Sequence, residues 1–221
     1  MKQTSHLAFR LATSLFAILL GVQCVWLLLA EFSRSGIDQL PTNAASAATA
    51  QNERVRAHRA ALLGAIRGDL WADSAFTYAD LLWGDGKGGA NLVRARSSLN
   101  YALADAPHKS SAWLLLAGLA SRYRVAGINA KQALKMSYYT GPSELQLMPL
   151  RLLITVHADS LSDIELRDFI GREVRVLFTH QQKSAVVAAY NAAPPAGRQF
   201  IERTIGEIDP SAVESLRAAT Q

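Results

Sequence analysis

One sparse pattern occurs twice in this chain, and the two copies lie 35 residues apart. Residues 95–107 read ARSSLNYALADAP, and residues 130–142 read AKQALKMSYYTGP. The matched residues are Ala95, Leu99, Ala102 and Pro107 in the first copy, and Ala130, Leu134, Ser137 and Pro142 in the second. This spacing is typical of one helix face that ends before a proline. A pattern repeated at a fixed distance predicts a stack of similar helical units.

Helix signals continue to the end of the chain, so the sequence predicts an all-α fold. Residues 54–70 carry an apolar stripe that Arg59 interrupts near its start. Residues 162–165 read SDIE, a capping box that opens a helix. Asp209 and Pro210 supply an N-cap and a first-turn proline for a last short helix.

A stretch beginning with tryptophan precedes each copy of the pattern. Residues 71–78 read WADSAFTY and residues 113–120 read WLLLAGLA. With the two copies, these stretches resemble two tetratricopeptide repeats, residues 68–107 and 110–142, whose period is about 34 residues. The alternative is an ordinary helical bundle in which alanine and leucine happen to recur.

The resemblance implies antiparallel helical hairpins stacked over residues 54–142. Residues 143–221 would follow as degenerate repeats or as a C-terminal cap, because Pro149 falls where a first helix should run. The turn WGDGKGGAN at residues 83–91 is longer than the turn of the family. In the family, the first helix of each repeat lines a concave surface that holds partner proteins.

Carried over by position, the resemblance implies a protein-binding groove in this chain. Its residues would be Asp69, Ala72, Phe76 and Asp80 in the first repeat, and Leu114, Ser121 and Arg122 in the second. We expect Phe76 and Arg122 to be the anchors, since aromatic and arginine side chains dominate many interfaces. Simple solvent exposure is the alternative for each of these residues.

The N-terminal part of the chain carries an uncharged apolar segment, residues 11–30, between Arg10 and Glu31. Twenty residues of helix span about 30 Å, the thickness of a bilayer core. Lys2 and Arg10 precede the segment, so the positive-inside rule predicts that residues 1–10 are cytoplasmic and that the rest lies across the membrane. A cleaved secretory signal and a buried soluble helix are the alternatives. Residues 31–53, small and polar, are expected to form a flexible linker.

Composition and motifs favour recognition over chemistry. The net charge of +5 is diffuse, which argues against nucleic-acid binding. GDGKGG at residues 84–89 lacks the order of a Walker loop, and the histidines and the single Cys24 have no metal-site spacing. We therefore expect no metal and no cofactor. The alternative is a hydrolase, whose candidate carboxylates would be Glu144, Asp159, Asp163, Glu165 and Asp168.

These features together predict a non-catalytic scaffold anchored in the inner membrane of a bacterium, with its domain in the periplasm. Its partners would be proteins of a cell-envelope assembly complex. Anchored proteins of this type resemble helpers of exopolysaccharide or O-antigen biosynthesis and export, and this resemblance implies the pathway that we expect. Cytochrome c maturation is the alternative pathway, and a periplasmic envelope hydrolase is the alternative of another class.

Overall fold

The computed structural model of the chain describes residues 2–84, 88–157, 159–180 and 182–218, apart from the side chains of residues 2–8, His157 and Asp159. Every regular element in these ranges is helical, which confirms the all-α prediction. The middle of the turn at residues 84–89 and the side chain of Asp159 lie outside the described residues.

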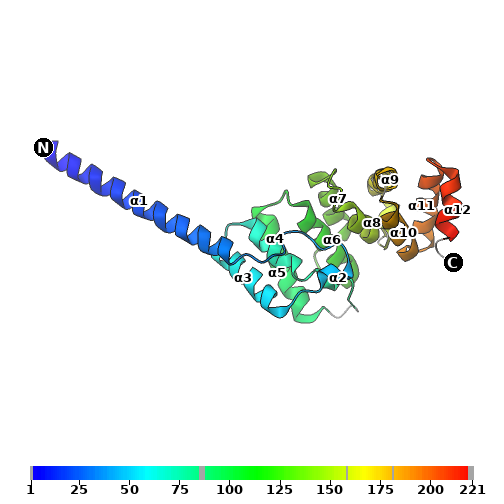
Figure 1. The fold of residues 1–221 in the computed structure, drawn as a ribbon, viewed down its shortest axis with the longest axis horizontal. Helices are drawn as coiled ribbons and strands as arrows, with labels where there is room; N and C mark the ends of the chain where they lie inside the picture. Colours follow the sequence, from blue (N-terminus) through cyan, green and yellow to red (C-terminus); the bar gives the residue numbers. More distant parts are fainter. Residues whose placement is uncertain (1, 85–87, 158, 181, 219–221) are drawn as a thin grey trace.

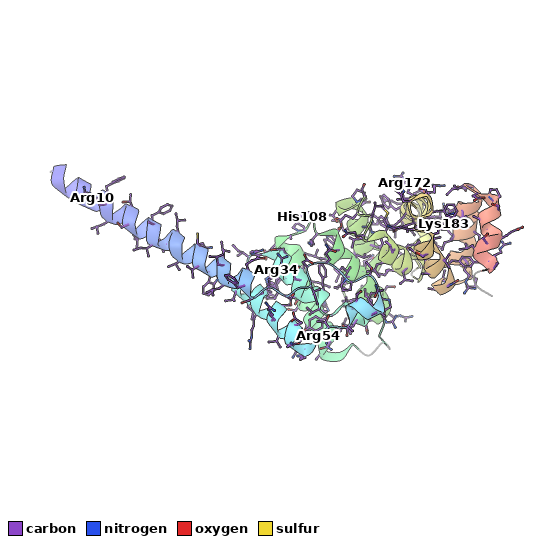
Figure 2. The ribbon with its side chains drawn as sticks, in the orientation of Figure 1. Arg10, Arg34, Arg54, His108, Arg172 and Lys183 are labelled. Atoms are coloured by element: carbon purple, nitrogen blue, oxygen red, sulfur yellow. The ribbon has the colours of Figure 1, made fainter. Side chains whose placement is uncertain are left out.

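The first helix, α1 (Lys2–Phe32), extends away from the rest of the molecule as a single rod (Figure 1). Its segment Phe9–Phe32 is long and apolar enough to cross a membrane. Large side chains of this segment are exposed along its length, among them Leu15 and Phe16. A helix that is apolar on all sides needs an apolar environment, and the domain supplies it only at the last turns. Figure 2 shows Arg10 near the outer end of this rod and Arg34 at its base.

Two helix pairs form the centre of the domain. The first consists of α4 (Gly68–Phe76) and α5 (Gly89–Asp105), joined through the short 3-10 helix η1 (Ala79–Leu82); the second consists of α6 (Ser110–Tyr123) and α7 (Ala130–Thr140). The members of each pair pack side by side. The start of α4 lies against the end of α5, because a Cβ added at Gly68 would lie 2.7 Å from Cβ of Ala106. The start of α6 meets the end of α7 in the same way, since a Cβ at Gly141 would lie 2.6 Å from Cβ of Ser110.

The repeated pattern occupies equivalent places in the two pairs. Leu99 and Leu134 are buried in the core, as are Ala102 and Ser137. Helix α5 ends at Asp105 and α7 ends at Thr140, each two residues before the proline of its copy. The proline cannot donate a backbone hydrogen bond, and it disfavours helical backbone in the residue before it. The matched leucines and the small residues that follow them therefore form a buried face in both pairs, and the prolines act as a stop signal.

The C-terminal part of the domain has a different arrangement. Its elements are α8 (Met148–His157), η2 (Asp159–Ser162), α9 (Ile164–Thr179), α10 (Lys183–Ala192), α11 (Pro195–Gly206) and α12 (Pro210–Ala218). Helix α8 packs chiefly against α10, and α11 packs against both α9 and α12. The sequence suggested that Pro149 would interrupt a helix, but it does not. Pro149 falls in the first turn of α8, where its missing N–H is not needed.

A fully buried polar cluster joins α7, α8 and α9. The Arg151 guanidinium Nη1 lies 3.3 Å from Glu173 Oε1, and the Tyr138 hydroxyl donates to Glu173 Oε2 at 2.8 Å. Arg151 Nη2 also donates to the carbonyl of Gly141 at 3.1 Å, and the guanidinium stacks over the Tyr138 ring at 4.6 Å. Burial raises the pKa of Glu173, although Arg151 and Tyr138 favour its charged form. The cluster therefore holds the C-terminal helices to the second helix pair through buried hydrogen bonds as well as apolar packing.

Removing one charge of this pair is expected to destabilise the domain strongly. In Arg151→Met, Glu173 would remain buried without a counter-charge, so the free energy of unfolding should fall by about 3–5 kcal/mol. The double variant Arg151→Met/Glu173→Leu removes both charges and should recover most of this loss. Urea unfolding of the full chain in detergent measures both effects, with exposed Arg172→Met as the control. Equal losses in the single and double variants would contradict this account.

Candidate functional site

Acidic residues between α4 and α5 and on α4 itself bind two arginines, one just after α1 and one in α3 (Gln51–Leu63). Arg34 Nε lies 2.7 Å from Oδ2 of Asp73, which is 1% exposed. Arg54 Nη2 lies 2.8 Å from Oδ2 of Asp80, and its Nε donates to the Thr77 carbonyl at 3.1 Å. The acidic side of α4 and η1 is therefore covered by this chain's own arginines.

The segment between α1 and α3, residues 33–50, lies against the domain at several points. Leu40 is 4% exposed and Ala47 is fully buried, and both belong to the hydrophobic core. The short helix α2 (Ala44–Ala47) is capped by Asn43, whose side chain accepts from the Ser46 amide at 2.9 Å. This packing differs from the flexible linker expected for residues 31–53. Isolated apolar residues and one arginine hold the segment in place, and none of them forms a periodic pattern.

A second set of ion pairs fixes the base of α1. Arg67 contacts Glu31 at 2.9 Å and Asp69 at 2.6 Å, and Arg34 contacts Glu31 at 3.3 Å. Helix α3 (Gln51–Leu63) packs along the end of α1, where the Trp26 indole donates to the Leu63 carbonyl at 2.6 Å. Asp69 therefore holds the base of α1 through Arg67.

Three of the expected groove residues are buried in the core. Ala72, Phe76 and Leu114 are all 0% exposed. Nearly the whole surface of α4 is covered, because α3, α5, α6 and the segment from residue 33 to residue 50 surround it. A side chain with no exposed surface cannot anchor a partner, so Phe76 is corrected from a groove residue to a core residue.

Of the other four expected residues, Asp69 and Asp80 form the ion pairs described above, and Ser121 and Arg122 line an apolar cavity of about 510 Å³ on the second helix pair. Ser121 and Arg122 stand at the end of α6, and the Arg122 guanidinium donates to the Gly84 carbonyl. The remaining lining residues are Leu82, Trp83, Gly118, Leu150, Leu153, Ile154 and Ala192. We name this hollow the Trp83 cavity. It joins η1, α6, α8 and α10, which no local pattern in the sequence could indicate.

Gly118 permits the close approach of helices at the base of this cavity. A Cβ at this position would lie 2.5 Å from Cδ2 of Leu82 and 3.0 Å from Cδ1 of Ile154. A larger residue would displace the side chains of Leu82 and Ile154, since a contact under 3.0 Å cannot be accommodated without movement. The glycine therefore contributes to the depth of the cavity.

A larger and more polar hollow of about 1020 Å³ lies on another part of the surface. Residues 36–43 and residues 143–147 form most of its walls, together with Lys109 and Gln182. Its walls combine the segment that follows α1 with the loop between α7 and α8. Across the ranges that the structure describes, no group of three histidine, cysteine or acidic side chains could hold a metal ion.

Three of the five candidate carboxylates of the hydrolase alternative are engaged in structural contacts. Asp163 caps α9 and pairs with Lys135 at 2.9 Å, and Glu165 pairs with the same lysine at 2.8 Å. Hydrogen bonds from Lys135 lower the pKa of both carboxyl groups, whereas a general acid needs a raised pKa. Glu144 accepts from the Ser110 hydroxyl at 2.6 Å, and Asp168 is exposed.

Asp73 should give the stability of the chain a recognisable pH dependence. Burial raises its pKa from the usual 3.8 to about 6, against the attraction of Arg34, so the folded chain holds this proton more tightly than the unfolded chain. Protonated Asp73 therefore stabilises the folded chain. This contribution to the free energy of unfolding is complete below pH 3.8 and is lost as the pH rises through about 6, and it amounts to about 3 kcal/mol. Urea titrations of the natural chain and of Asp73→Asn at several pH values should therefore diverge in this window. Parallel pH curves would contradict the prediction.

Comparison with known protein families, with curated proteins and with solved structures finds no match to this chain. The function of the chain is therefore inferred from the geometry described above. Its strongest element is the Trp83 cavity, which combines an aromatic residue, an arginine and aliphatic walls on one side of the domain.

Proposed function

We propose that the chain is a non-catalytic adaptor of the bacterial cell envelope, anchored in the inner membrane by α1 and docking partner proteins with its helical domain. In this proposal the domain is periplasmic and tetratricopeptide-like, and its partners belong to exopolysaccharide or O-antigen biosynthesis and export. The observation that carries the docking role is the Trp83 cavity.

The composition of this cavity supports protein recognition. Tryptophan and arginine are enriched among the residues that contribute most to binding between proteins, and such residues cluster where water is excluded. Leu150 is buried, and Leu153 and Ile154 are half-buried, so the cavity offers aliphatic walls to an incoming side chain. A volume of about 510 Å³ admits a few side chains of a partner segment.

The first part of the chain supports the anchoring role. Apolar side chains are exposed along α1, while Glu31, Arg34 and Arg67 form ion pairs at its base. Lys2 and Arg10 precede the apolar segment, as the positive-inside rule requires for a cytoplasmic N-terminus. The tetratricopeptide-like interpretation is supported by the equivalent packing of α4 with α5 and of α6 with α7.

Photo-crosslinking in intact membranes tests the docking role. A photoreactive phenylalanine analogue replaces Trp83 in one variant and Ser121 in another, and the same analogue at exposed Arg172 on α9 serves as the control. We expect both cavity positions to capture the same envelope protein, and Arg122→Ala to reduce that adduct about tenfold. No common adduct at the cavity positions, or an equal yield at position 172, would contradict the proposal.

Reporter fusions at the C-terminus test the proposed topology. Alkaline phosphatase folds only outside the cytoplasm, so its fusion should be active, whereas a green fluorescent protein fusion exported in the unfolded state should stay dark. Adding lysines after residue 32 and removing Lys2 and Arg10 should reverse both signals, which provides the control. A fluorescent fusion of the natural chain without phosphatase activity would overturn the orientation.

A further inference from the structure

We propose that the loop between α3 and α4 lies in the interface of the bilayer that α1 spans, so that the domain rests on lipid through Leu62 and Ile66. This inference rests on the proposed anchoring of α1. The occupant of the surface is the bilayer itself, with acyl chains against the two apolar residues and anionic headgroups against nearby arginines.

Helix α3 returns along the last turns of α1 in the opposite direction. Near its end, the Leu63 carbonyl accepts from the Trp26 indole, and nearer its start, Arg56 reaches the Phe32 carbonyl at 3.4 Å. Trp26 precedes Phe32 by six residues, a rise of about 9 Å in a helix. The end of α3 therefore lies nearer the middle of α1 than its start does. Figure 1 shows α3 at the base of α1, on the side of the domain that faces the rod.

The charges at the two ends of the apolar segment define how deep Trp26 lies. Arg10 and Glu31 enclose residues 11–30, whose helical length of about 30 Å matches a hydrocarbon core. With the core placed there, Trp26 lies about 6 Å inside the level of Ala30. Shifting the core toward the N-terminus to keep Trp26 in water would draw Arg10 into hydrocarbon, which is costly. The hydrogen bond from Trp26 therefore brings the end of α3 to the lipid interface.

The residues beside Leu63 have the composition that this position requires. Leu62 is 56% exposed and Ile66 is 80% exposed, although both are large aliphatic residues. Arg67 follows immediately and is held by Glu31 and Asp69, which fixes the loop beside α1. The exposed apolar surface of the loop is thus continuous with that of α1.

Two arginines stand on the water side of this loop. Arg59 precedes Leu63 by one helical turn and Arg56 by about two, and both are exposed. Residues one or two turns above the apolar contact reach the level of the lipid phosphates. Basic side chains above an apolar face are typical of helices that lie in an anionic membrane interface. In this arrangement Arg59, which interrupts the apolar stripe in the sequence, lies at the level of the lipid phosphates.

Lipid quenching of a fluorescent label in the full chain tests this inference. In a Cys24→Ser background, Ile66→Cys, Ile164→Cys and Leu20→Cys each carry one NBD label, and the proteins are reconstituted in phosphatidylglycerol and phosphatidylcholine vesicles. Ile164 is 70% exposed on α9, far from α1 in Figure 1, so it is the matched control for Ile66. Leu20 lies in the middle of α1 and reports on the anchor itself.

We expect lipids spin-labelled near the headgroup to quench position 66 at least about twofold more than position 164, with a blue-shifted emission at position 66. Lipids labelled deep in the chain should quench position 20. Quenching at position 20 with equal signals at 66 and 164 would overturn the loop contact and leave the anchor standing. A lack of quenching at position 20 would overturn the anchor and the inference together. A blue shift at position 66 without lipid quenching would assign the surface to a protein and also overturn the inference.

Discussion

The contact between Arg34 and Asp73 is the interaction on which the placement of the domain depends. Asp73 lies on a helix that is covered on nearly all sides, and a buried carboxylate needs a partner of opposite charge. This partner is Arg34, which lies outside the helix pairs, two residues after the end of α1. The pair therefore neutralises the buried acidic residue of α4 and adds to the other contacts that join the segment after α1 and the rod to the domain.

A second buried carboxylate plays the corresponding part at the other end of the domain. Glu173 on α9 is held by Arg151 on α8 and by Tyr138 on α7. In both places an arginine from one segment neutralises an acidic residue of another. Such pairs add little net stability compared with apolar packing, but losing one partner is costly. They favour one arrangement of helices over others that would bury as much apolar surface.

The sequence predicts the helices well because their signals are local. The stripe of α5 and α7 and the prolines that follow these helices each act within a few residues, and the structure contains them. The helix start predicted from residues 162–165 is also present, but Asp163 rather than Ser162 caps α9. Burial, in contrast, depends on the whole fold. This explains why some expected groove residues are buried in the core whereas others line the Trp83 cavity. Phe76 would be exposed on a helix covered from one side, but α4 has neighbours on several sides. Leu40 and Ala47 gave no signal, because single apolar residues in a polar segment do not reveal what they contact. Trp83 meets Arg122 only through tertiary packing between η1 and α6.

The continuity of α1 into the domain has a mechanical consequence. Ala30 is fully buried and Trp26 is bonded to α3, so no swivel separates the rod from the body that it carries. A lateral force on the domain at the Trp83 cavity would therefore tilt α1, because the contacts between α1 and the domain leave no flexible linker to absorb it. In the proposed arrangement, with α1 in a bilayer, a partner bound at the Trp83 cavity would keep a fixed height and orientation relative to the membrane.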